Sequence, residues 1–289
     1  MKIGIIGLGL IGGSFALAAK KHALDVDLYG EDKNEEHLNT ALELGIVQHT
    51  LAPKMYAQMD VILLGIPVDA ASACVIELLD AMNDNALLFD VGSTKASICE
   101  KVALHPKRNQ FLATHPIAGT EFSGPSAAFA ELFVNQTQIL CETHKTRPDL
   151  LEWAMQFFRS LQMQIEEMDP HAHDQHIAYV SHLSHISSFM LGKTVMEKEE
   201  DERAIFGMAG SGFASTVRLA KSSPEMWAPI FRQNKKYILD VLQEYISNLE
   251  QFKILLENGD WEQMRIQMKK INAIQIILEG IPERNNNKN

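Results

Sequence analysis

The first 168 residues alternate between short apolar runs and longer amphipathic stretches. Short apolar runs bounded by turn residues are typical of buried strands, and apolar residues three and four apart are typical of helices. Strands that alternate with helices predict a mostly parallel, doubly wound sheet of the α/β class. The predicted strands cover residues 2–6, 26–29, 46–47 (a short edge strand), 61–65, 86–91, 111–113, 138–141 and 164–167, and the predicted helices cover residues 34–44, 68–82 and 148–161, with two more that begin near residues 12 and 95.

After residue 168 the pattern changes, because no further run is typical of a strand. We therefore predict an α/β domain over residues 1–168 and an all-helical domain over residues 169–289. Within the second domain, the predicted elements are a helix over 173–196, a charged stretch over 197–203 that is a solvated loop or a helix end, a glycine-rich segment over 207–213, an amphipathic helix over 226–256 that ends at Gly259, and a last helix over 261–278 capped by Asp260.

The predicted helix over 226–256 has an apolar face with little chain of its own to cover it. Apolar side chains recur along it at helical spacing, and a small helical domain offers few partners for them. A second subunit would bury this face, so we predict a homodimer formed through the C-terminal helices. The residues of the face are Tyr237, Ile238, Val241, Leu242, Tyr245, Leu249 and Leu256.

A glycine-rich turn with the spacing G-x-G-x-x-G follows the first predicted strand. Its glycines are Gly7, Gly9 and Gly12, with Leu10 and Ile11 between the last two. In such a turn the first glycine permits the sharp bend, the second lets the backbone approach a pyrophosphate, and the third lets helix and strand pack closely. The helix N-terminus then favours the negative charge of the phosphates. The turn therefore predicts a Rossmann nucleotide-binding domain.

An acidic pair at the end of the second predicted strand indicates NAD rather than NADP. Asp32 lies 20 residues after Gly12, where a carboxylate binds the ribose hydroxyls of NAD. Glu31 and Asp32 together would repel a 2′-phosphate, and no arginine is near them in the sequence. Two alternatives stay open for the turn: a strand–helix connection without a ligand, and the cofactor site of a methyltransferase.

Charge and composition exclude several classes of protein. A net charge of −11 at pH 7 argues against nucleic-acid binding. No apolar run reaches the roughly 18 residues that span a bilayer, and the chain enters a strand at once, which leaves no room for a signal peptide. Three scattered cysteines, Cys74, Cys99 and Cys141, indicate free thiols in a reducing compartment, so we expect a cytoplasmic protein without a membrane partner.

Three residues follow predicted strands at the edge of the sheet where ligands bind. They are Pro67, Ser93 and His115. Because ligands of a doubly wound sheet lie at the carboxyl ends of its strands, Pro67 is expected beside the cofactor, and Ser93 and His115 are expected near the nicotinamide. Ser93 is equally well explained as the N-cap of the next helix. A lone histidine before a proline is more often a buried structural residue.

The segments around these residues resemble the prephenate dehydrogenase family. The resemblance rests on blocks that occur in the family's order and cover nearly the whole chain, so it is more specific than any single motif. The blocks are GLGLIGGS at 7–14, DVGSTK at 90–95, HPIAGTE at 115–121, SHLSH at 181–185, GSGF at 210–213, TVRLA at 216–220 and the tryptophan at 227.

The resemblance implies an NAD-dependent oxidative decarboxylation of prephenate to 4-hydroxyphenylpyruvate in tyrosine biosynthesis. A neutral histidine has a pKa suited to accepting the proton of the ring hydroxyl, so His115 is the expected general base, and Ser93 is expected to hold the same hydroxyl. No metal is expected, because aromatisation drives the loss of CO2. The expected substrate-binding residues are Arg218, which matches the family's carboxylate-binding arginine, and Ser181, His185, Glu121 and Trp227.

The chain departs from the family pattern just before Thr216. Ala214 and Ser215 stand where the family often has a basic and an acidic residue. This departure keeps two alternatives open, an arogenate dehydrogenase and a dual-specificity cyclohexadienyl dehydrogenase. A β-hydroxyacid or imine reductase and a non-catalytic NAD sensor are remoter alternatives. Feedback inhibition by tyrosine is expected only at the active site, because no regulatory domain follows the helical one.

Overall fold

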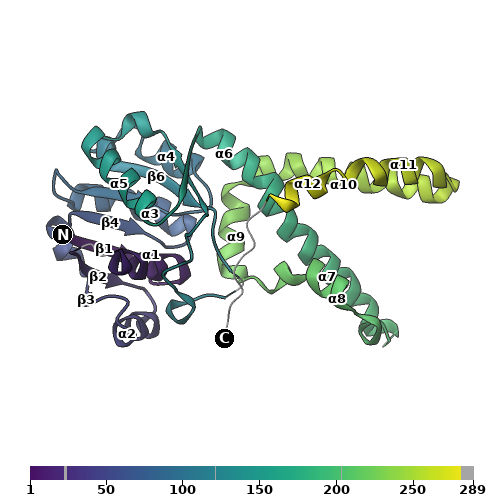
Figure 1. The fold of residues 1–289 in the computed structure, drawn as a ribbon, viewed down its shortest axis with the longest axis horizontal. Helices are drawn as coiled ribbons and strands as arrows, with labels where there is room; N and C mark the ends of the chain where they lie inside the picture. The colour runs from purple at the N-terminus through teal and green to yellow at the C-terminus, as the bar shows by residue number, and fades with distance from the viewer. Residues whose placement is uncertain (23–24, 121, 203, 281–289) are drawn as a thin grey trace. The chain divides into compact units, whose positions relative to one another are not determined.

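A computed structural model of the chain describes residues 1–22, 25–120, 122–202 and 204–280 (Figure 1). Its sheet has eight strands in the order β3-β2-β1-β4-β5-β6-β7-β8. All neighbouring strands are parallel except β6 and β7, so the prediction of a doubly wound, mostly parallel sheet is confirmed. The strands are β1 (Lys2–Ile6), β2 (Asp27–Glu31), β3 (His49–Thr50), β4 (Val61–Leu64), β5 (Leu87–Asp90), β6 (Phe111–Pro116), β7 (Thr137–Cys141) and β8 (Gln164–Met168).

Two apolar cores, one on each face, hold the sheet against the helices that cover it. Successive side chains of a strand point to opposite faces. Ile5 and Leu63 accordingly enter one core, while Ile6 and Leu64 enter the other. The helices that follow the strands are α1 (Leu10–Lys21), α2 (Glu35–Glu43), α3 (Val68–Ala81), α4 (Ala96–Val102) and α5 (Pro148–Ser160).

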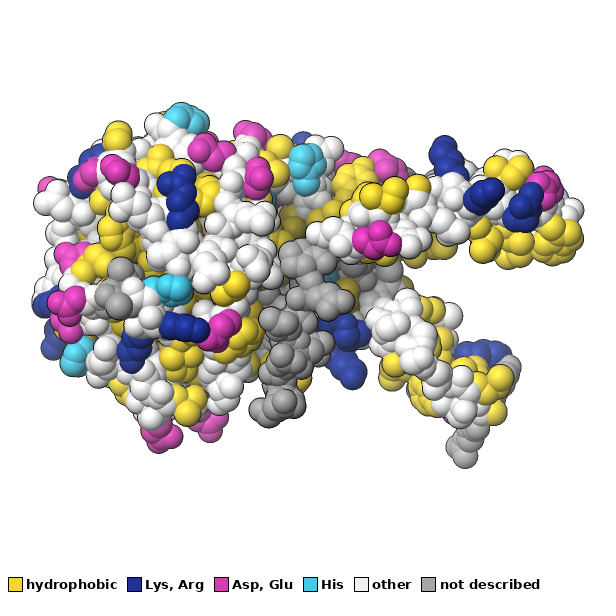
Figure 2. Space-filling view, viewed as in Figure 1, with side chains coloured by type: hydrophobic (Ala, Val, Ile, Leu, Met, Phe, Trp, Pro, Cys, Tyr) yellow, Lys and Arg dark blue, Asp and Glu magenta, His cyan; other side chains and the backbone are white. Residues whose placement is uncertain are grey.

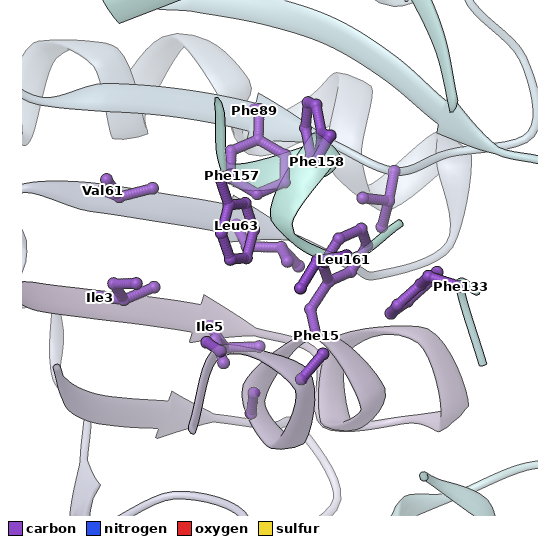
Figure 3. Packing of buried hydrophobic residues seen from close by; sticks show 14 of the residues in the cluster. Ile3, Ile5, Phe15, Val61, Leu63, Phe89, Phe133, Phe157, Phe158 and Leu161 are labelled. Carbon is purple, nitrogen blue, oxygen red and sulfur yellow. The ribbon is translucent and has the colours of Figure 1, made fainter. Parts of the chain in front are cut away.

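Aromatic rings fill the core against which α1 packs (Figure 3). Phe15 of α1 stacks on Phe133 with ring centroids 4.0 Å apart and meets Phe89 of β5 edge-on at 6.0 Å. Phe157 and Phe158 of α5 belong to the same cluster. Full burial of a phenylalanine side chain contributes about 1.5–3 kcal/mol. The cluster therefore fixes α1, and with it the glycine turn that precedes α1, against the sheet.

The edge strand lies a few residues later than the sequence predicts. Ile46 and Val47 are buried, but their backbone N–H groups donate to the carbonyl of Ala41 in α2, at 2.8 and 3.4 Å. Because these donors already have partners, the pair does not join the sheet, and the edge is formed by β3. The predicted strand at 46–47 is therefore wrong, and core burial alone explains the apolar pair.

The chain divides into two units, Met1–Lys235 and Lys236–Asn289. In the first unit a helical segment follows the sheet. The predicted single helix over 173–196 is wrong in detail, because a π-helical turn interrupts it. The charged stretch, predicted as a loop or a helix end, forms the end of α7 as far as Glu202. The segment consists of α6 (Pro170–Ile177), the π turn (Ala178–His182), α7 (Leu183–Glu202), α8 (Ser211–Thr216), a 3₁₀ turn (Arg218–Lys221) and α9 (Pro224–Gln233).

The predicted helix over 226–256 is divided at Asn234 into α9 and α10 (Lys235–Asn258). The side-chain amide of Asn234 donates to the carbonyl of Asp174 at 2.7 Å, and its backbone (φ −96°, ψ 19°) leaves helical geometry. A contact distant in sequence therefore ends α9, and the sequence pattern of the helix gave no sign of it.

In the second unit both predicted end signals are confirmed. Gly259 follows α10 with a φ of +65°, and the Asp260 side chain caps α11 (Trp261–Ile271) by accepting a hydrogen bond from the N–H of Gln263 at 3.3 Å. The last predicted helix is divided, because α12 (Ile274–Glu279) follows α11 as a separate element. None of the helices that the structure describes is long and apolar enough to cross a membrane.

Candidate active site

Packing requires two of the three glycines in the turn after β1. Gly7 has a φ of +98°, and a Cβ built on it would lie 2.4 Å from the carbonyl oxygen of Gly65. A Cβ on Gly12 would lie 2.0 Å from the carbonyl oxygen of Gly7. Contacts this short are repulsive, so any other residue at either position would displace β1, β4 or α1 from one another.

The middle glycine faces open space instead. Apart from its own chain neighbours and helix backbone, none of the described residues has an atom within 4 Å of a Cβ built on Gly9. Gly9 is the N-cap of α1, which begins at Leu10 rather than near Gly12 as predicted. The N–H groups of the first helical turn, including those of Leu10 and Ile11, have no acceptor within the helix. A free approach to a helix N-terminus is what a pyrophosphate requires, so these residues fit a dinucleotide cofactor.

Hydrogen bonds fix the acidic pair Glu31 and Asp32 at the end of β2. Asp32 accepts from the N–H of Leu8 in the glycine turn at 2.8 Å and from the N–H of Asn34 at 2.9 Å. Glu31 accepts from the hydroxyl of Tyr56 at 2.7 Å, and burial together with this contact raises the pKa of Tyr56. Two carboxylates held beside the turn suit the ribose hydroxyls of NAD and disfavour a 2′-phosphate. Pro67, the exposed N-cap of α3, follows β4.

His115 lies inside β6 rather than after its end. The predicted strand over 111–113 extends to Pro116 because β6 continues to pair with β7, where His115 stands opposite Ile139. The imidazole is buried, and its Nδ1 lies 2.8 Å from Nε2 of His173. Burial, followed by the charges of His173 and Lys95, holds the pKa of His115 well below its usual range. The ring is therefore neutral at physiological pH, as a general base requires.

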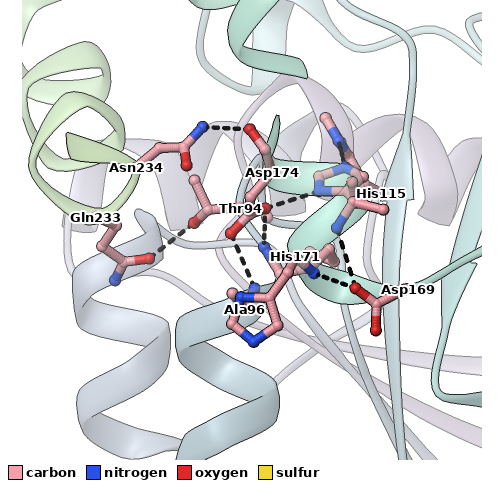
Figure 4. Close-up of polar contacts among 12 residues, drawn as sticks. Thr94, Ala96, His115, Asp169, His171, Asp174, Gln233 and Asn234 are labelled. Atoms are coloured by element: carbon pink, nitrogen blue, oxygen red, sulfur yellow. Dashed lines mark hydrogen bonds and ion pairs between the residues drawn. The ribbon is translucent and has the colours of Figure 1, made fainter. Parts of the chain in front are cut away.

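Sequence reasoning missed the two residues behind His115. Nδ1 of His173 lies 2.8 Å from Oδ1 of Asp174, so the three side chains form one hydrogen-bonded chain (Figure 4). All three are buried. The only signal in the sequence is a cluster of histidines with one aspartate, HAHDQH, at the start of the helical segment. Such a cluster on a helix is more often solvated and does not by itself indicate a site.

Ser93 does not cap α4. The N-cap of that helix is Lys95, whose side chain does not cap it, and the cap is supplied from far along the chain. The carboxylate of Asp174 accepts from the N–H groups of Lys95 and Ala96 at 2.7 and 2.9 Å (Figure 4). Ser93 is half-buried in the turn between β5 and α4, which the buried ion pair between Lys95 and Asp90 holds in place.

A second group of predicted residues gathers around Trp227 of α9. His185 stacks on the indole with ring centroids 3.5 Å apart, and Nδ1 of His185 lies 2.9 Å from the carbonyl oxygen of Ser181, one turn earlier. Burial lowers the pKa of His185, and the positive charge of Arg218 lowers it further. Arg218 itself is exposed at the start of its 3₁₀ turn. The structure therefore brings Ser181, His185, Arg218 and Trp227 together.

Two amide side chains at the end of α9, together with an edge-on contact of His182 with Trp227 at 5.8 Å, join this group to the His115 chain. Asn234 donates to the carbonyl of Asp174 at 2.7 Å and to Nδ1 of His182 at 3.0 Å. Gln233 accepts from the hydroxyl of Thr94, the neighbour of Ser93, at 2.7 Å (Figure 4). Burial, the largest effect, lowers the pKa of His182 to about 4. The candidate site is thus one connected region of the first unit.

Three further positions bear on the substrate. Glu121, a predicted substrate-binding residue, lies outside the residues that the structure describes. Ala214 and Ser215 lie exposed on α8, and the hydroxyl of Ser215 donates to the carbonyl of Gly212 at 2.9 Å. Neither side chain replaces the basic and acidic pair of the family pattern.

Comparisons with known proteins match most of the chain. Residues 15–167 match the family model described as prephenate dehydrogenase, nucleotide-binding domain, and residues 169–270 match prephenate dehydrogenase, dimerization domain. A prephenate dehydrogenase of Bacillus subtilis is 32% identical over 264 residues, which are 90% of this chain and 71% of the relative. A cyclohexadienyl dehydrogenase of Zymomonas mobilis is 29% identical over 280 residues, 96% of each chain.

A solved structure extends the likeness to the fold. The crystal structure of prephenate dehydrogenase from A. aeolicus, in complex with hydroxyphenyl propionate and NAD+, superposes with a TM-score of 0.89. The two chains are 28% identical, and the match covers 96% of this chain and 98% of that one.

The open space at Gly9 leads to a prediction for Gly9→Ala. The added methyl group meets no atom from elsewhere in the described ranges, so the free energy of unfolding should change by no more than about 1 kcal/mol. The same group occupies the path of the pyrophosphate, so the Kd for NADH should rise at least about tenfold. Urea unfolding and NADH fluorescence titration measure the two quantities.

Gly12→Ala is the matched control, because there the methyl group meets the backbone of Gly7 and should lower stability as well. Unchanged NADH affinity in Gly9→Ala would show that the cofactor does not approach this turn.

Proposed function

The chain belongs to the prephenate dehydrogenase family, and on that premise we propose that it oxidatively decarboxylates prephenate to 4-hydroxyphenylpyruvate in tyrosine biosynthesis. It is an NAD-dependent oxidoreductase of the Rossmann type. The observation that carries the substrate reaction is the buried, neutral imidazole of His115 at the sheet edge that also bears the cofactor turn. A group of this kind suits the removal of a proton from a substrate alcohol.

The chemistry at the ring carbinol is assigned to two residues. Nε2 of His115 has no hydrogen-bond partner among the described residues, and we assign it to accept the proton of the substrate hydroxyl. Ser93, on the turn after β5, is assigned to hold the same hydroxyl and so to orient the carbon that loses hydride. The cofactor supplies the hydride acceptor when it is bound. Aromatisation of the ring then drives the loss of CO2.

The carboxylates of the substrate need positive or hydrogen-bonding partners. Arg218 is assigned to one of them, because its planar guanidinium can donate two parallel hydrogen bonds. The surroundings of His185 support this assignment, since the charge of Arg218 acts on that ring. Ser181, His185 and Trp227 are assigned to line the same pocket, and Glu121 is assigned to organise it.

A second candidate function differs only in the side chain of the substrate. Ala214 and Ser215 offer neither charge of the family pattern, so recognition of the pyruvyl side does not depend on that pair. An arogenate dehydrogenase or a dual-specificity cyclohexadienyl dehydrogenase, the name borne by the Zymomonas relative, would use the same chemistry at His115.

We assign the cofactor to residues 1–168, and the substrate contacts and a homodimer interface to residues 169–289. Residues 169–270 match a dimerization domain. Large apolar side chains are exposed throughout the second unit, where hydrophobic surface gathers in Figure 2. Exposed apolar patches of this kind mark interaction sites, and a second copy of the chain is the partner we propose. They include Leu239, Leu249, Ile254, Trp261, Ile271, Ile276 and Ile277.

We place the protein in the cytoplasm. Its three cysteines are free thiols, and burial raises the pKa of Cys141 to about 12, so that this thiol stays protonated. Reduced, unreactive cysteines are usual in a cytoplasmic enzyme. Recovery of the protein in a periplasmic or membrane fraction of its own cells would contradict the placement.

Turnover should depend on both the substrate and the form of the cofactor. The wild-type enzyme should turn over prephenate with NAD, and kcat/KM with NADP should be at least about tenfold lower, a difference of about 1.4 kcal/mol. The reason is the repulsion of a 2′-phosphate by Glu31 and Asp32. Absorbance of NADH measures both rates. Faster turnover of arogenate would replace the substrate and keep the mechanism, whereas NADH binding without turnover of either compound would support a sensor.

His115→Asn and Arg218→Ala should affect different kinetic constants. Asparagine keeps a polar group near the position of Nδ1 but has no counterpart of Nε2, so kcat should fall by about 10²–10⁴-fold. Loss of a charged hydrogen-bond donor costs about 1.5–3 kcal/mol, so Arg218→Ala should raise the KM for prephenate by roughly 10- to 100-fold. Steady-state kinetics separates the two effects. Activity of His115→Asn within twofold of wild type would refute the base assignment.

The proposed dimer predicts a mass of two chains of 32.3 kDa by light scattering. Leu249→Glu places a charge on the apolar face of α10 and should shift the protein toward monomer. Leu104→Glu is the control, because Leu104 is 98% exposed in the first unit and should leave the mass unchanged. A wild-type monomer over a wide concentration range would contradict the dimer.

A further inference from the structure

We propose that His173 and Asp174 are positioning residues that fix His115 in the tautomer whose Nε2 is unprotonated. The inference rests on the proposed function, because it concerns how the general base of that reaction is prepared. It adds two buried residues to the site and assigns each a role through the direction of its hydrogen bonds.

Asp174 determines which atoms donate and which accept along this chain of hydrogen bonds. An ionised carboxylate has no proton to donate, and here its Oδ1 accepts from the N–H of Lys95 at 2.7 Å while its Oδ2 accepts from the N–H of Ala96 at 2.9 Å. These are the first N–H groups of α4, and a helix N-terminus favours negative charge. The atom that meets Oδ1 from His173, at 2.8 Å, must therefore be an N–H.

A proton on Nδ1 of His173 decides the state of its other nitrogen. A neutral imidazole carries one proton, so Nε2 of His173 is an acceptor. That nitrogen lies 2.8 Å from Nδ1 of His115. Nδ1 of His115 must then donate, which leaves the lone pair of His115 on Nε2, the nitrogen that has no partner in the part of the chain that the structure describes. Without this chain the two tautomers of His115 would compete, and one of them cannot accept a proton at Nε2.

Both imidazole rings must be neutral for this pattern of hydrogen bonds, and their surroundings keep them so. Burial lowers the pKa of His173 and of His115. The other charged and titratable groups that act on the pair are Lys95, which lowers both pKa values, His182, which lowers that of His115, and Asp174 and Asp90, which raise that of His173. Lys95 is itself paired with Asp90, so its charge is largely balanced within the same cluster.

The chain also stabilises the product of proton transfer. When the O–H bond of the substrate breaks, its electron pair stays on oxygen and an N–H bond forms at Nε2 of His115. The ring becomes an imidazolium whose Nδ1–H bonds to His173, and the negative charge of Asp174 lies behind it. Hydrogen bonds of a charged donor are stronger than neutral ones. No second proton has to move.

Substitution of His173 separates tautomer control from folding. His173→Leu removes the acceptor for Nδ1 of His115, whereas His173→Gln places an amide oxygen near the same point. Nitrogen-15 NMR of histidine-labelled protein, with the His115 signals assigned by His115→Asn, reads the tautomer directly. Wild type and His173→Gln should show Nδ1 protonated, and His173→Leu should show a shift toward the Nε2-protonated form.

Kinetics supplies the second readout. In His173→Leu we expect kcat to fall by about 10²-fold, the lower end of what a positioned acid–base group contributes, with the KM for prephenate and the Kd for NADH within about twofold. His173→Gln should recover part of this loss. His176→Leu, at an exposed position of the same helix, is the control and should match wild type.

Three results would overturn the proposal. They are an Nε2-protonated His115 in the wild type, an unchanged kcat in a folded His173→Leu, and a His173→Gln variant as slow as His173→Leu. If His173→Leu does not fold, the tautomer of His115 in the wild type and the kcat of His173→Gln still test the proposal. Failure of the proposed function is distinguishable, because it would appear as absent turnover in the wild type while the NMR result stands.

Discussion

The structure of the site depends on one buried carboxylate. Asp174 accepts from two N–H groups at the start of α4, nearly 80 residues earlier in the sequence, and from His173 beside it. Each of those backbone donors would cost about 1–3 kcal/mol if it were left buried without a partner. The stability of the junction between sheet and helical segment therefore uses the same atoms that orient the imidazoles. Selection for a folded protein and selection for an ordered site act on the same side chain.

Burial sets the chemistry of the groups around this carboxylate. His115 and His173 are neutral because burial leaves too little water around them to stabilise a charge. Lys95 and Asp90 stay paired in the same interior, where Asp90 also accepts from the N–H of Gly92 at 2.9 Å. A buried ion pair is tolerated when its hydrogen bonds are satisfied. The pair anchors the turn that carries Ser93, so that this turn and β6 keep their relative position.

Local patterns were enough to predict most of the sheet and the cofactor turn. Apolar runs identify strands because burial is their common cause, and the glycines after β1 identify the turn because packing at Gly7 and Gly12 excludes any side chain. The features that were missed depend on distant contacts. Asn234 ends α9 through Asp174 and His182, and no property of the sequence near residue 234 reveals those partners.

The residues of the candidate site likewise divide into those that local sequence patterns predict and those that depend on distant contacts. His115 and Ser93 were found from their places after predicted strands and from the family resemblance. His173 was not found, because the sequence around a helical histidine does not show which side chain its ring will contact in the fold. Its role follows only from two distances and from the inability of a carboxylate to donate. Partner identity, rather than residue type, is the information that the sequence lacks here.

The π turn between α6 and α7 sets the angular phase of everything that follows it in the segment. Each helical residue turns the chain by about 100°, and a π turn contains one residue more than an α-helical turn. Winding the same residues as an ordinary α-helix would rotate His185 away from the indole of Trp227. Deleting one residue inside the π turn would instead leave an α-helix with His185 still facing the indole, whereas a deletion elsewhere in the helix would turn His185 by about 100°. The helix therefore tolerates the loss of one residue inside this turn better than outside it.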